Sequence, residues 1–248
     1  MFTAEYWNNR AVKYGHTGHS ESFYYCYGQQ ARLYAINEII KKLQSPKNNA
    51  LDFGCGSGDF INVLNNHYKT IYAFDISDEV IKKVKQQYNQ KNIIILDELT
   101  SSITFDLILT VTVLQTLNKT ELEKQLSFFS KLLSEKGVMV SMEFFTTDDY
   151  NIKLNETKAT IKDWNDALEN NHLKITSTTG INNAILNPIK SWKSYNNNLL
   201  LKLLKPFKNN SFAQRQFIKV SEKLIYKYKD VLNTNDYPFK IHIIEKEK

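Results

Sequence analysis

The sequence predicts an α/β fold built on a doubly wound, seven-stranded, mostly parallel sheet with an added helical cap. Three observations predict it. Between about residues 50 and 145, short apolar runs alternate with segments of helical periodicity. These runs are almost continuously apolar, which is typical of strands whose two faces are both covered by helices. The first run ends in a glycine-rich stretch, where such folds turn from strand to helix.

The strands follow from apolar runs bounded by turn residues. Right-handed crossovers are expected between the parallel strands. The last run alternates apolar and polar residues, which indicates an antiparallel partner at the sheet edge. The expected strands are residues 50–53, 70–75, 92–96, 105–113, 137–145, 173–179 and 239–246.

The helices follow from apolar residues at helical spacing and from capping residues. Ser77 precedes Asp78 and Glu79, two carboxylates suited to the first turn of a helix. Thr120 and Glu123 fit a capping box before a further amphipathic helix. The other expected helices are residues 24–45, 59–67 and 160–171, and residues 190–232 also carry helical periodicity.

Length and composition indicate one globular domain with an appended lid. We expect a helical cap over residues 1–45 and the main α/β domain over residues 46–248, with a cap or lid insertion at about 180–235. The first ten residues do not resemble a secretory signal, and no uncharged apolar run approaches the ~20 residues of a membrane helix. A cytoplasmic protein without membrane insertion is therefore expected.

Cysteine and histidine usage indicates no bound metal. The two cysteines, Cys26 and Cys55, provide neither a disulfide framework nor a metal-binding spacing. The five histidines form no zinc motif. We expect Cys55 to serve packing only.

Positive charge is concentrated near the C-terminal end of the sequence. Residues 186–248 hold 13 Lys and Arg against 5 Asp and Glu, whereas residues 1–185 hold 19 against 21. Such a segment suits a nucleic acid, a membrane surface or a phosphorylated substrate. An amphipathic lid helix with a solvated basic face explains the same pattern.

The glycine-rich stretch "LDFGCGSGDF", residues 51–60, indicates a ligand other than a dinucleotide. The dinucleotide fingerprint requires a third glycine where this chain has Asp59, whose charge would repel a pyrophosphate. No Gly-Lys-Ser/Thr follows, so the loop is not a P-loop. Asp75 ends the second strand, where an acid accepts hydrogen bonds from ribose hydroxyls. The pattern favours a cationic nucleoside without phosphates.

These motifs resemble those of the class I S-adenosylmethionine-dependent methyltransferases, which have a Rossmann-like fold. "LDFGCGSGDF" with the downstream "FDIS" is similar to the first two motifs of that family, "LDELT" to its adenine loop, and "FDLILTVTVLQTL" to its fourth strand and turn. The resemblance implies S-adenosylmethionine as cofactor. By motif position it implies a site made by Asp52, Gly54, Gly56, Asp75, Ile76, Asp97, Glu98, Leu99 and Thr110.

The resemblance also implies a role for each of these residues. Gly54 and Gly56 would allow a close turn under the methionyl part, and Asp52 would orient that turn or receive the ammonium group through water. Asp75 would bind the ribose diol, although an acid that only caps the helix after Ser77 explains it too. Ile76 and Leu99 would pack on adenine. Asp97 or Glu98 would reach its amino group, although a solvated loop acid is an equal reading of Glu98.

The methyl acceptor is expected to be a small molecule, possibly anionic, methylated on oxygen. No Asn/Asp-Pro-Pro-Tyr/Phe follows the fourth strand, as methylation of a base amino group would require, and no Pro-Cys pair supports cytosine-carbon methylation. Residues 6–25 resemble the head segment of methyltransferases of bacterial surface-polysaccharide pathways. That resemblance implies a sugar or a phosphate or phosphoramidate group of a capsular or surface glycan precursor.

Three residues are candidates for the general base. His16 and His19 are candidates because imidazole titrates near neutrality, although a histidine that caps the following helix or is simply exposed explains each of them more readily. Glu143 interrupts an apolar strand near its carboxyl end, where either a basic partner or an exposed strand end would also explain it. The candidate acceptor-binding residues are Tyr14, Tyr24, Tyr25, Gln115 and Trp192; packing could also explain the aromatic ones, and Gln115 could contact the cofactor instead.

Two other functions are compatible with the sequence. An RNA methyltransferase would use the basic C-terminal region, although a nucleic acid is not the expected partner. A non-catalytic binding module would keep the fold without transferring a methyl group.

Overall fold

The computed structural model describes residues 3–18, 22–145, 158–180, 205–207, 210, 212–217, 219 and 240–247. The chain divides into two compact units. The first contains residues 1–17, 43–178 and 238–248, and the second contains residues 18–42 and 179–237. The expected boundary of a cap at residue 45 stays a prediction.

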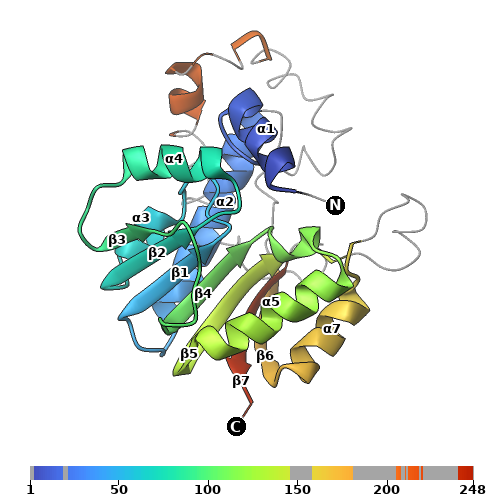
Figure 1. The fold of residues 1–248 in the computed structure, drawn as a ribbon. Coiled ribbons are helices and arrows are strands. Elements are labelled where there is room, and N and C mark those ends of the chain that lie inside the picture. Colours follow the sequence, from blue (N-terminus) through green and yellow to red (C-terminus); the bar gives the residue numbers. More distant parts are fainter. Residues whose placement is uncertain are drawn as a thin grey trace. The chain divides into compact units, whose positions relative to one another are not determined.

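The first unit is built on a seven-stranded sheet in the order β3-β2-β1-β4-β5-β7-β6 (Figure 1). Neighbours pair in parallel from β3 to β5, and β7 pairs antiparallel with β5. The predicted α/β class and the seven strands are confirmed. The strands are β1 (Asn49–Phe53), β2 (Thr70–Phe74), β3 (Ile93–Ile95), β4 (Phe105–Val111), β5 (Leu133–Glu143), β6 (Leu173–Gly180) and β7 (Lys240–Lys246).

The position expected for the last strand at the sheet edge is wrong. β7 lies between β5 and β6, and β6 forms the edge. Ile241 and Ile244 of β7 are buried, whereas most β6 side chains between its ends are partly or fully exposed. Alternation alone did not separate these strands, because a half-buried inner strand and an edge strand show the same period of two.

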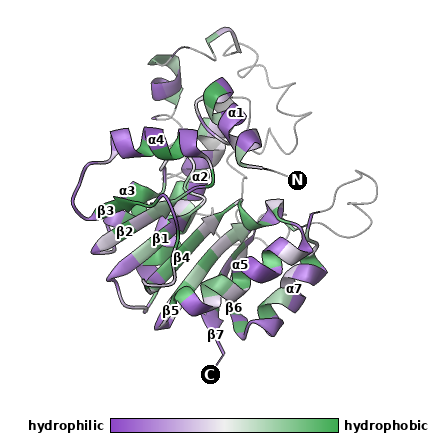
Figure 2. Ribbon diagram, viewed as in Figure 1, coloured by the Kyte–Doolittle hydropathy of each residue, from purple (hydrophilic) through white to green (hydrophobic). Residues whose placement is uncertain are grey.

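Helices α5 (Lys119–Leu132) and α7 (Ile161–Asn170) lie side by side over the β4–β6 half of the sheet (Figure 1). Helices α3 (Ile61–Asn65) and α4 (Asp78–Gln87) pack against β2 and β3, respectively. In Figure 2, hydrophilic and hydrophobic residues alternate along α4, as expected for an amphipathic helix. A core forms between α5, α7 and the strands, and it includes Leu51, Phe105, Ile108, Leu122, Leu126, Phe129, Leu132, Met139, Trp164, Leu168 and Ile244.

Helix α5 begins two residues earlier than the sequence predicted. Asn118 is the capping residue: its Oδ1 accepts from the Glu121 backbone N–H, and Glu121 Oε2 accepts from the Asn118 N–H, both at 3.0 Å. Thr120 is exposed inside the first turn. Both positions satisfy the capping-box spacing, and Asn118 has the extended backbone that a cap requires.

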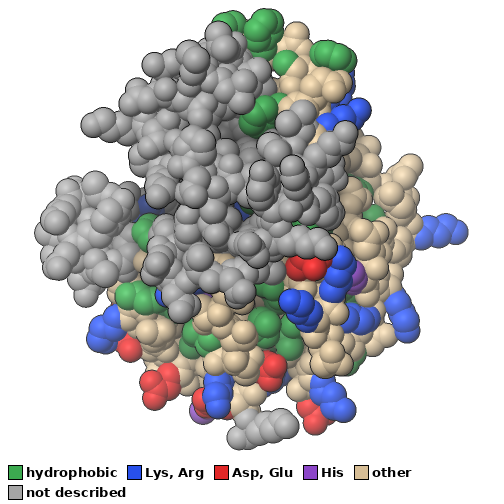
Figure 3. All heavy atoms as spheres, turned by 180° about the vertical axis from the view of Figure 1, so that it is seen from behind, with side chains coloured by type: hydrophobic (Ala, Val, Ile, Leu, Met, Phe, Trp, Pro, Cys, Tyr) green, Lys and Arg blue, Asp and Glu red, His purple; other side chains and the backbone are tan. Residues whose placement is uncertain are grey.

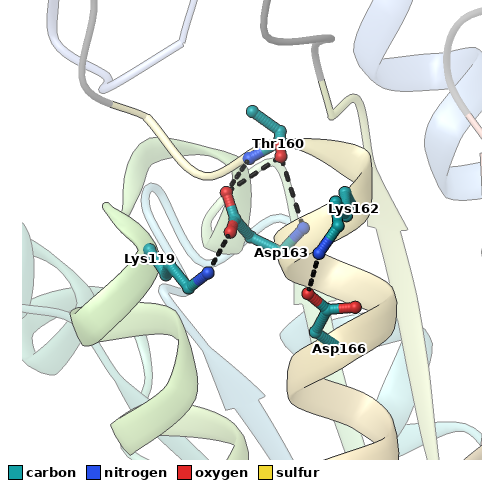
Figure 4. Close-up of polar contacts among 5 residues, drawn as sticks. All are labelled: Lys119, Thr160, Lys162, Asp163 and Asp166. Carbon is teal, nitrogen blue, oxygen red and sulfur yellow. Dashed lines mark hydrogen bonds and ion pairs between the residues drawn. The ribbon is translucent and has the colours of Figure 1, made fainter.

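A second capping box opens α7 and ties it to α5 (Figure 4). Thr160 Oγ1 accepts from the Asp163 N–H at 3.3 Å, and Asp163 Oδ2 accepts from the Thr160 N–H at 3.0 Å. Lys119 of α5 lies 3.0 Å from Asp163 Oδ1. Although partial burial opposes it, these hydrogen bonds hold the pKa of Asp163 below its ordinary value.

Helix α1 (Ala4–Tyr14) belongs to the same unit as the sheet and packs on α4. Thr3 caps its first turn through a hydrogen bond from the Tyr6 N–H. Lys83 of α4 donates to the carbonyl of Ala11 at 2.8 Å, near the carboxyl end of α1. The N-terminal segment is therefore joined to the helix that follows β2.

The second unit contains α2 (Ser22–Lys42) and the short helix η3 (Lys205–Phe207). The helix expected over residues 24–45 is confirmed, with both ends shifted by two to three residues. The helix and lid expected over residues 190–232 lie mostly outside the described residues. Among the described helices, none has the length and apolarity to cross a membrane. The described side chains also form no cluster suited to a metal ion.

Candidate cofactor site

The residues singled out in the sequence meet at the carboxyl ends of the parallel strands. Asp52 lies near the end of β1, Asp75 follows β2, and Glu143 ends β5. Helix η1 (Leu114–Thr116) follows β4 in the same region. Ligands of open parallel sheets bind at this edge, because loops from neighbouring strands converge there.

The glycine turn after β1 is held close to β2 and to the turn after β4. The backbone N–H groups of Gly54 and Cys55 both donate to the Phe74 carbonyl, at 2.7 and 3.0 Å. Gly54 has φ +73°, and a Cβ there would overlap Val113 Cγ2 and lie 3.0 Å from its Cγ1. Only glycine fits both the left-handed backbone and this space. The missing side chain of Gly54 therefore lets the turn after β4 pack directly against the glycine turn.

Asp75 holds together the two turns that frame the site. Its Oδ2 accepts from the Gly56 N–H and its Oδ1 from the Ser77 N–H, both at 2.9 Å. Burial raises the pKa of the carboxyl group, and these backbone donors oppose that rise. A carboxylate has about four lone-pair sites, so the backbone donors of Gly56, Ser77 and Ile76 leave about one for a hydroxyl of a ribose.

Asp52 is a buried carboxylate without a matching charge. Its side chain is 2 % exposed, and Oδ2 has no hydrogen-bond partner among the described residues. Burial, with repulsion from Asp75 and Asp59, raises the pKa of Asp52 to about 8. An unsatisfied buried carboxylate is costly, and a cationic donor group from a ligand would remove that cost.

The residues predicted to contact adenine differ in their exposure to solvent. Ile76 is 55 % exposed directly after Asp75, an apolar surface suited to a flat ring. The Asp97 carboxylate forms an ion pair with Lys85 of α4 at 2.6 and 2.7 Å, and its side chain is 78 % exposed. Glu98 is exposed, and Leu99 is half-buried against the core. Ile76 has the surface that this role requires.

Glu143 anchors the turn after β4. It is 2 % exposed; Oε1 accepts from the Val113 N–H and Oε2 from the Gln115 N–H, each at 3.2 Å. The side chain of Gln115 adds a bond to the residue after Glu143, since its Oε1 accepts from the Phe144 N–H at 2.7 Å. Thr110 is buried beneath this network and donates to Ser141 Oγ at 2.9 Å. The carboxyl group thus joins the ends of β4 and β5.

Backbone donors explain the buried Glu143, in place of the basic partner or exposed strand end that the sequence left open. Burial raises the pKa of Glu143 to about 7, against the effect of the donors at Gln115, Leu114 and Val113. Its role as a base stays a prediction, as does acceptor contact by Gln115.

Thr112 adopts a conformation that the sequence did not indicate. It directly follows β4 with φ +58°, a region that β-branched residues rarely occupy. Its N–H donates to the Met142 carbonyl at 2.8 Å. A strained residue held by the neighbouring strand is typical of ligand-binding turns.

The remaining candidates are only partly described. His16 follows α1, and its ring stacks on that of Tyr14 with centroids 6.4 Å apart. Tyr25 lies on α2, in the second unit. His19, Trp192 and the side chain of Tyr24 lie outside the described residues.

Sequence reasoning did not find two residues that contact the site turns. Asn8 Oδ1 accepts from Ser77 Oγ at 2.6 Å, a contact across 69 residues of sequence. Thr17 Oγ1 lies 3.1 Å from the position of a Cβ added at Gly56. Polar residues such as Asn8 and Thr17 belong to no motif, so the sequence did not indicate these contacts.

Comparison with known proteins identifies the family of this chain. A family described as a methyltransferase domain matches residues 27–186, well over half of the chain. Among curated proteins, none matches this sequence.

Solved structures with the same fold share little sequence with this chain. An S-adenosylmethionine-dependent methyltransferase from Leishmania major aligns with a TM-score of 0.59 at 12% identity, covering 98% of this chain and 81% of its own. The cyclopropane synthase MmaA2 from Mycobacterium tuberculosis aligns at 0.57 and 12%, covering 87% and 84%. An S-adenosylmethionine-dependent methyltransferase from Clostridium acetobutylicum aligns at 0.56 and 12%, covering 90% and 92%.

The matched residues 27–186 contain strands β1 to β6, the glycine turn, Asp52 and Asp75. The chain belongs to the methyltransferase domain family and is a class I S-adenosylmethionine-dependent methyltransferase.

Proposed function

We propose that the carboxyl ends of β1 and β2 form the methyl-donor site and that the enzyme methylates an oxygen of a small molecule. Asp52, Gly54, Gly56, Asp75 and Ile76 would hold S-adenosylmethionine. The methyl group of that cofactor is bonded to a positively charged sulfur, which makes it an electrophile. The protein has to bind, align and deprotonate the acceptor.

The unsatisfied Asp52 carboxylate is the observation that supports the donor site best. Oδ2 is buried beside the bare glycine turn and lacks a hydrogen-bond partner among the described residues. Asp75 and Asp59 make the surroundings more negative. A phosphate would be repelled there, whereas the ammonium group of a methionyl moiety would supply both positive charge and donors.

The adenosine part would lie along the turn after β2. The two carboxylate oxygens of Asp75 keep acceptor capacity beyond their bonds to Gly56 and Ser77. The exposed side chain of Ile76 would pack on the adenine ring. Leu99, Asp97 and Glu98 stay proposed adenine contacts, and Asp97 would have to share its oxygens with Lys85.

His16 is our proposed general base among the described candidates. It directly precedes Thr17, whose Oγ1 approaches Gly56 in the glycine turn. Imidazole accepts a proton near neutral pH. Glu143 is less suited to this role, because its two oxygens already accept from backbone N–H groups and it is almost fully buried.

The mixed charges on the face shown in Figure 3 favour a small-molecule acceptor over RNA. On the face shown in Figure 3, Lys and Arg side chains are interspersed with Asp and Glu. RNA recognition would require a basic stripe, and the basic residues 190–232 lie mostly outside the described residues. The described contacts do not select a surface-glycan precursor, so the proposal stops at a hydroxyl-bearing small molecule.

The donor site can be tested by calorimetry with S-adenosylhomocysteine, which carries the same ammonium group. Binding should ionise Asp52, whose pKa is about 8, so a proton is released at pH 7. Affinity should then rise about tenfold per pH unit up to pH 8. Asp52→Asn should lose the proton release and bind about ten- to a hundredfold more weakly at pH 8.

Titration in two buffers of different ionisation enthalpy measures the released proton. Asp97→Asn, which removes an exposed carboxylate near the same site, is the control and should keep the proton release. Equal proton release by the wild type and Asp52→Asn would contradict the role of Asp52. Methyl transfer from labelled cofactor to RNA, and not to sugars, sugar phosphates or phenols, would contradict the acceptor class.

A further inference from the structure

We infer that Asn8 is a positioning residue for the methyl donor. The inference rests on the proposed function, because it concerns the same turns. Asn8 lies on α1 and contacts the start of α4, directly after Asp75 and Ile76. Its contacts join the N-terminal segment to the turn that would hold adenosine.

Asn8 adds a second cap to α4. Its Oδ1 accepts from Ser77 Oγ at 2.6 Å and from the Glu79 backbone N–H at 3.3 Å. Ser77 itself caps the helix by accepting from the Val80 N–H. The backbone N–H of Glu79 can only donate, so the amide oxygen of Asn8 must face it.

The hydrogen bonds continue from Asn8 into the glycine turn. Ser77 is fully buried, and its N–H donates to Asp75 Oδ1 at 2.9 Å. Asp75 Oδ2 accepts from the Gly56 N–H at 2.9 Å. One chain of bonds therefore runs from α1 through Ser77 and Asp75 to Gly56. Displacing Ser77 would move the carboxylate that binds the ribose.

The same segment reaches the glycine turn from its other end. Thr17 Oγ1 lies 3.1 Å from the position of a Cβ added at Gly56. The Thr17 carbonyl accepts from Arg10 Nε at 3.1 Å, which ties it back to α1. Asn8 thus contacts the turn after β2, and Thr17 lies beside the glycine turn after β1.

The test measures the affinity for S-adenosylhomocysteine by calorimetry in three variants. Asn8→Leu keeps the size of the side chain and removes the acceptor, and we expect about tenfold weaker binding, equivalent to 1.4 kcal/mol. Asn8→Asp keeps an oxygen that can accept both bonds and suits a helix N-terminus, so it should bind within about threefold of the wild type. Asn165→Leu makes the same change at an exposed position of α7 and should leave affinity unchanged.

Each outcome decides a separate point. Weak binding by Asn8→Leu together with near-wild-type binding by Asn8→Asp supports the inference. Both side chains are close in size to asparagine, so a role in packing alone would not depend on the acceptor oxygen that only Asp keeps. Equal binding by Asn8→Leu and the wild type overturns it and leaves the proposed function intact. No binding by the wild type overturns both. If Asn8→Leu does not fold, wild-type-like binding by Asn8→Ala overturns the inference, and weaker binding supports it.

Discussion

Replacing Glu143 by glutamine should change how stability depends on pH. The carboxyl group has a pKa of about 7 in the folded protein and an ordinary value of 4.5. The folded state therefore holds the proton more tightly than the unfolded state. Stability contributed by this group is full below pH 4.5 and is lost as the pH rises to about 7, because a charge must then be kept in a buried site.

The size of the effect follows from that difference. A shift from 4.5 to about 7 corresponds to about 3.4 kcal/mol, of which about 2.5 kcal/mol is lost between pH 5 and pH 8. The side chain of the Glu143→Gln variant would carry no charge and would not show this loss. At pH 5 the variant should be about 1–3 kcal/mol less stable than the wild type, because its amide NH₂ faces the N–H of Val113 or Gln115.

Urea unfolding of both proteins at pH 5, 6, 7 and 8, followed by circular dichroism, measures these free energies. The stability of the wild type minus that of Glu143→Gln should fall by about 2.5 kcal/mol over this range, so that by pH 8 the variant is about as stable as the wild type or more stable. Glu135→Gln, at an exposed position of the same strand, should give a difference that does not vary with pH. A constant difference for Glu143→Gln would refute the reasoning.

Two further substitutions test local geometry by thermal and urea unfolding. Gly54→Ala should cost about 1–2 kcal/mol for its left-handed backbone and more for the overlap with Val113. Gly15 has the same left-handed backbone, but a Cβ added there would have no described atom within 4 Å, so Gly15→Ala is the control. An equal loss of stability in Gly15→Ala and Gly54→Ala would argue against the overlap with Val113. Thr160→Ala removes the α7 cap and should cost about 1 kcal/mol, whereas Thr160→Ser should keep most of it. Equal losses in the last two variants would show that the hydroxyl is not the source of the stability.

Local patterns were sufficient to predict the seven strands and to bring the proposed donor-site residues to neighbouring strand ends. The glycine turn and Asp75 follow strands that were recognisable as apolar runs, and the structure joins them through the Gly56–Asp75 hydrogen bond. The fold class, the family and the cofactor are confirmed. These features depend on residues that are close in sequence or that end neighbouring strands, so spacing alone brings them together.

Long-range contacts were not predictable in the same way. The buried Glu143 was noticed as an anomaly, but its partners are backbone N–H groups, which every residue other than proline carries and which therefore leave no trace in the sequence. The hydrogen bond between Asn8 and Ser77 forms only because α1 packs on α4. The insertion of β7 between β5 and β6 depends on the pairing of strands far apart in the chain.

The insertion of β7 also has a consequence for how the protein is made on the ribosome. β5 pairs antiparallel with β7 from Val138 to Glu143, and β6 joins the sheet through β7. Until residues 240–246 emerge from the exit tunnel, one edge of β5 is unpaired and β6 has no strand beside it. Unpaired strand edges can pair with strands of other chains and cause aggregation. Chaperones would therefore protect the protein best during this interval.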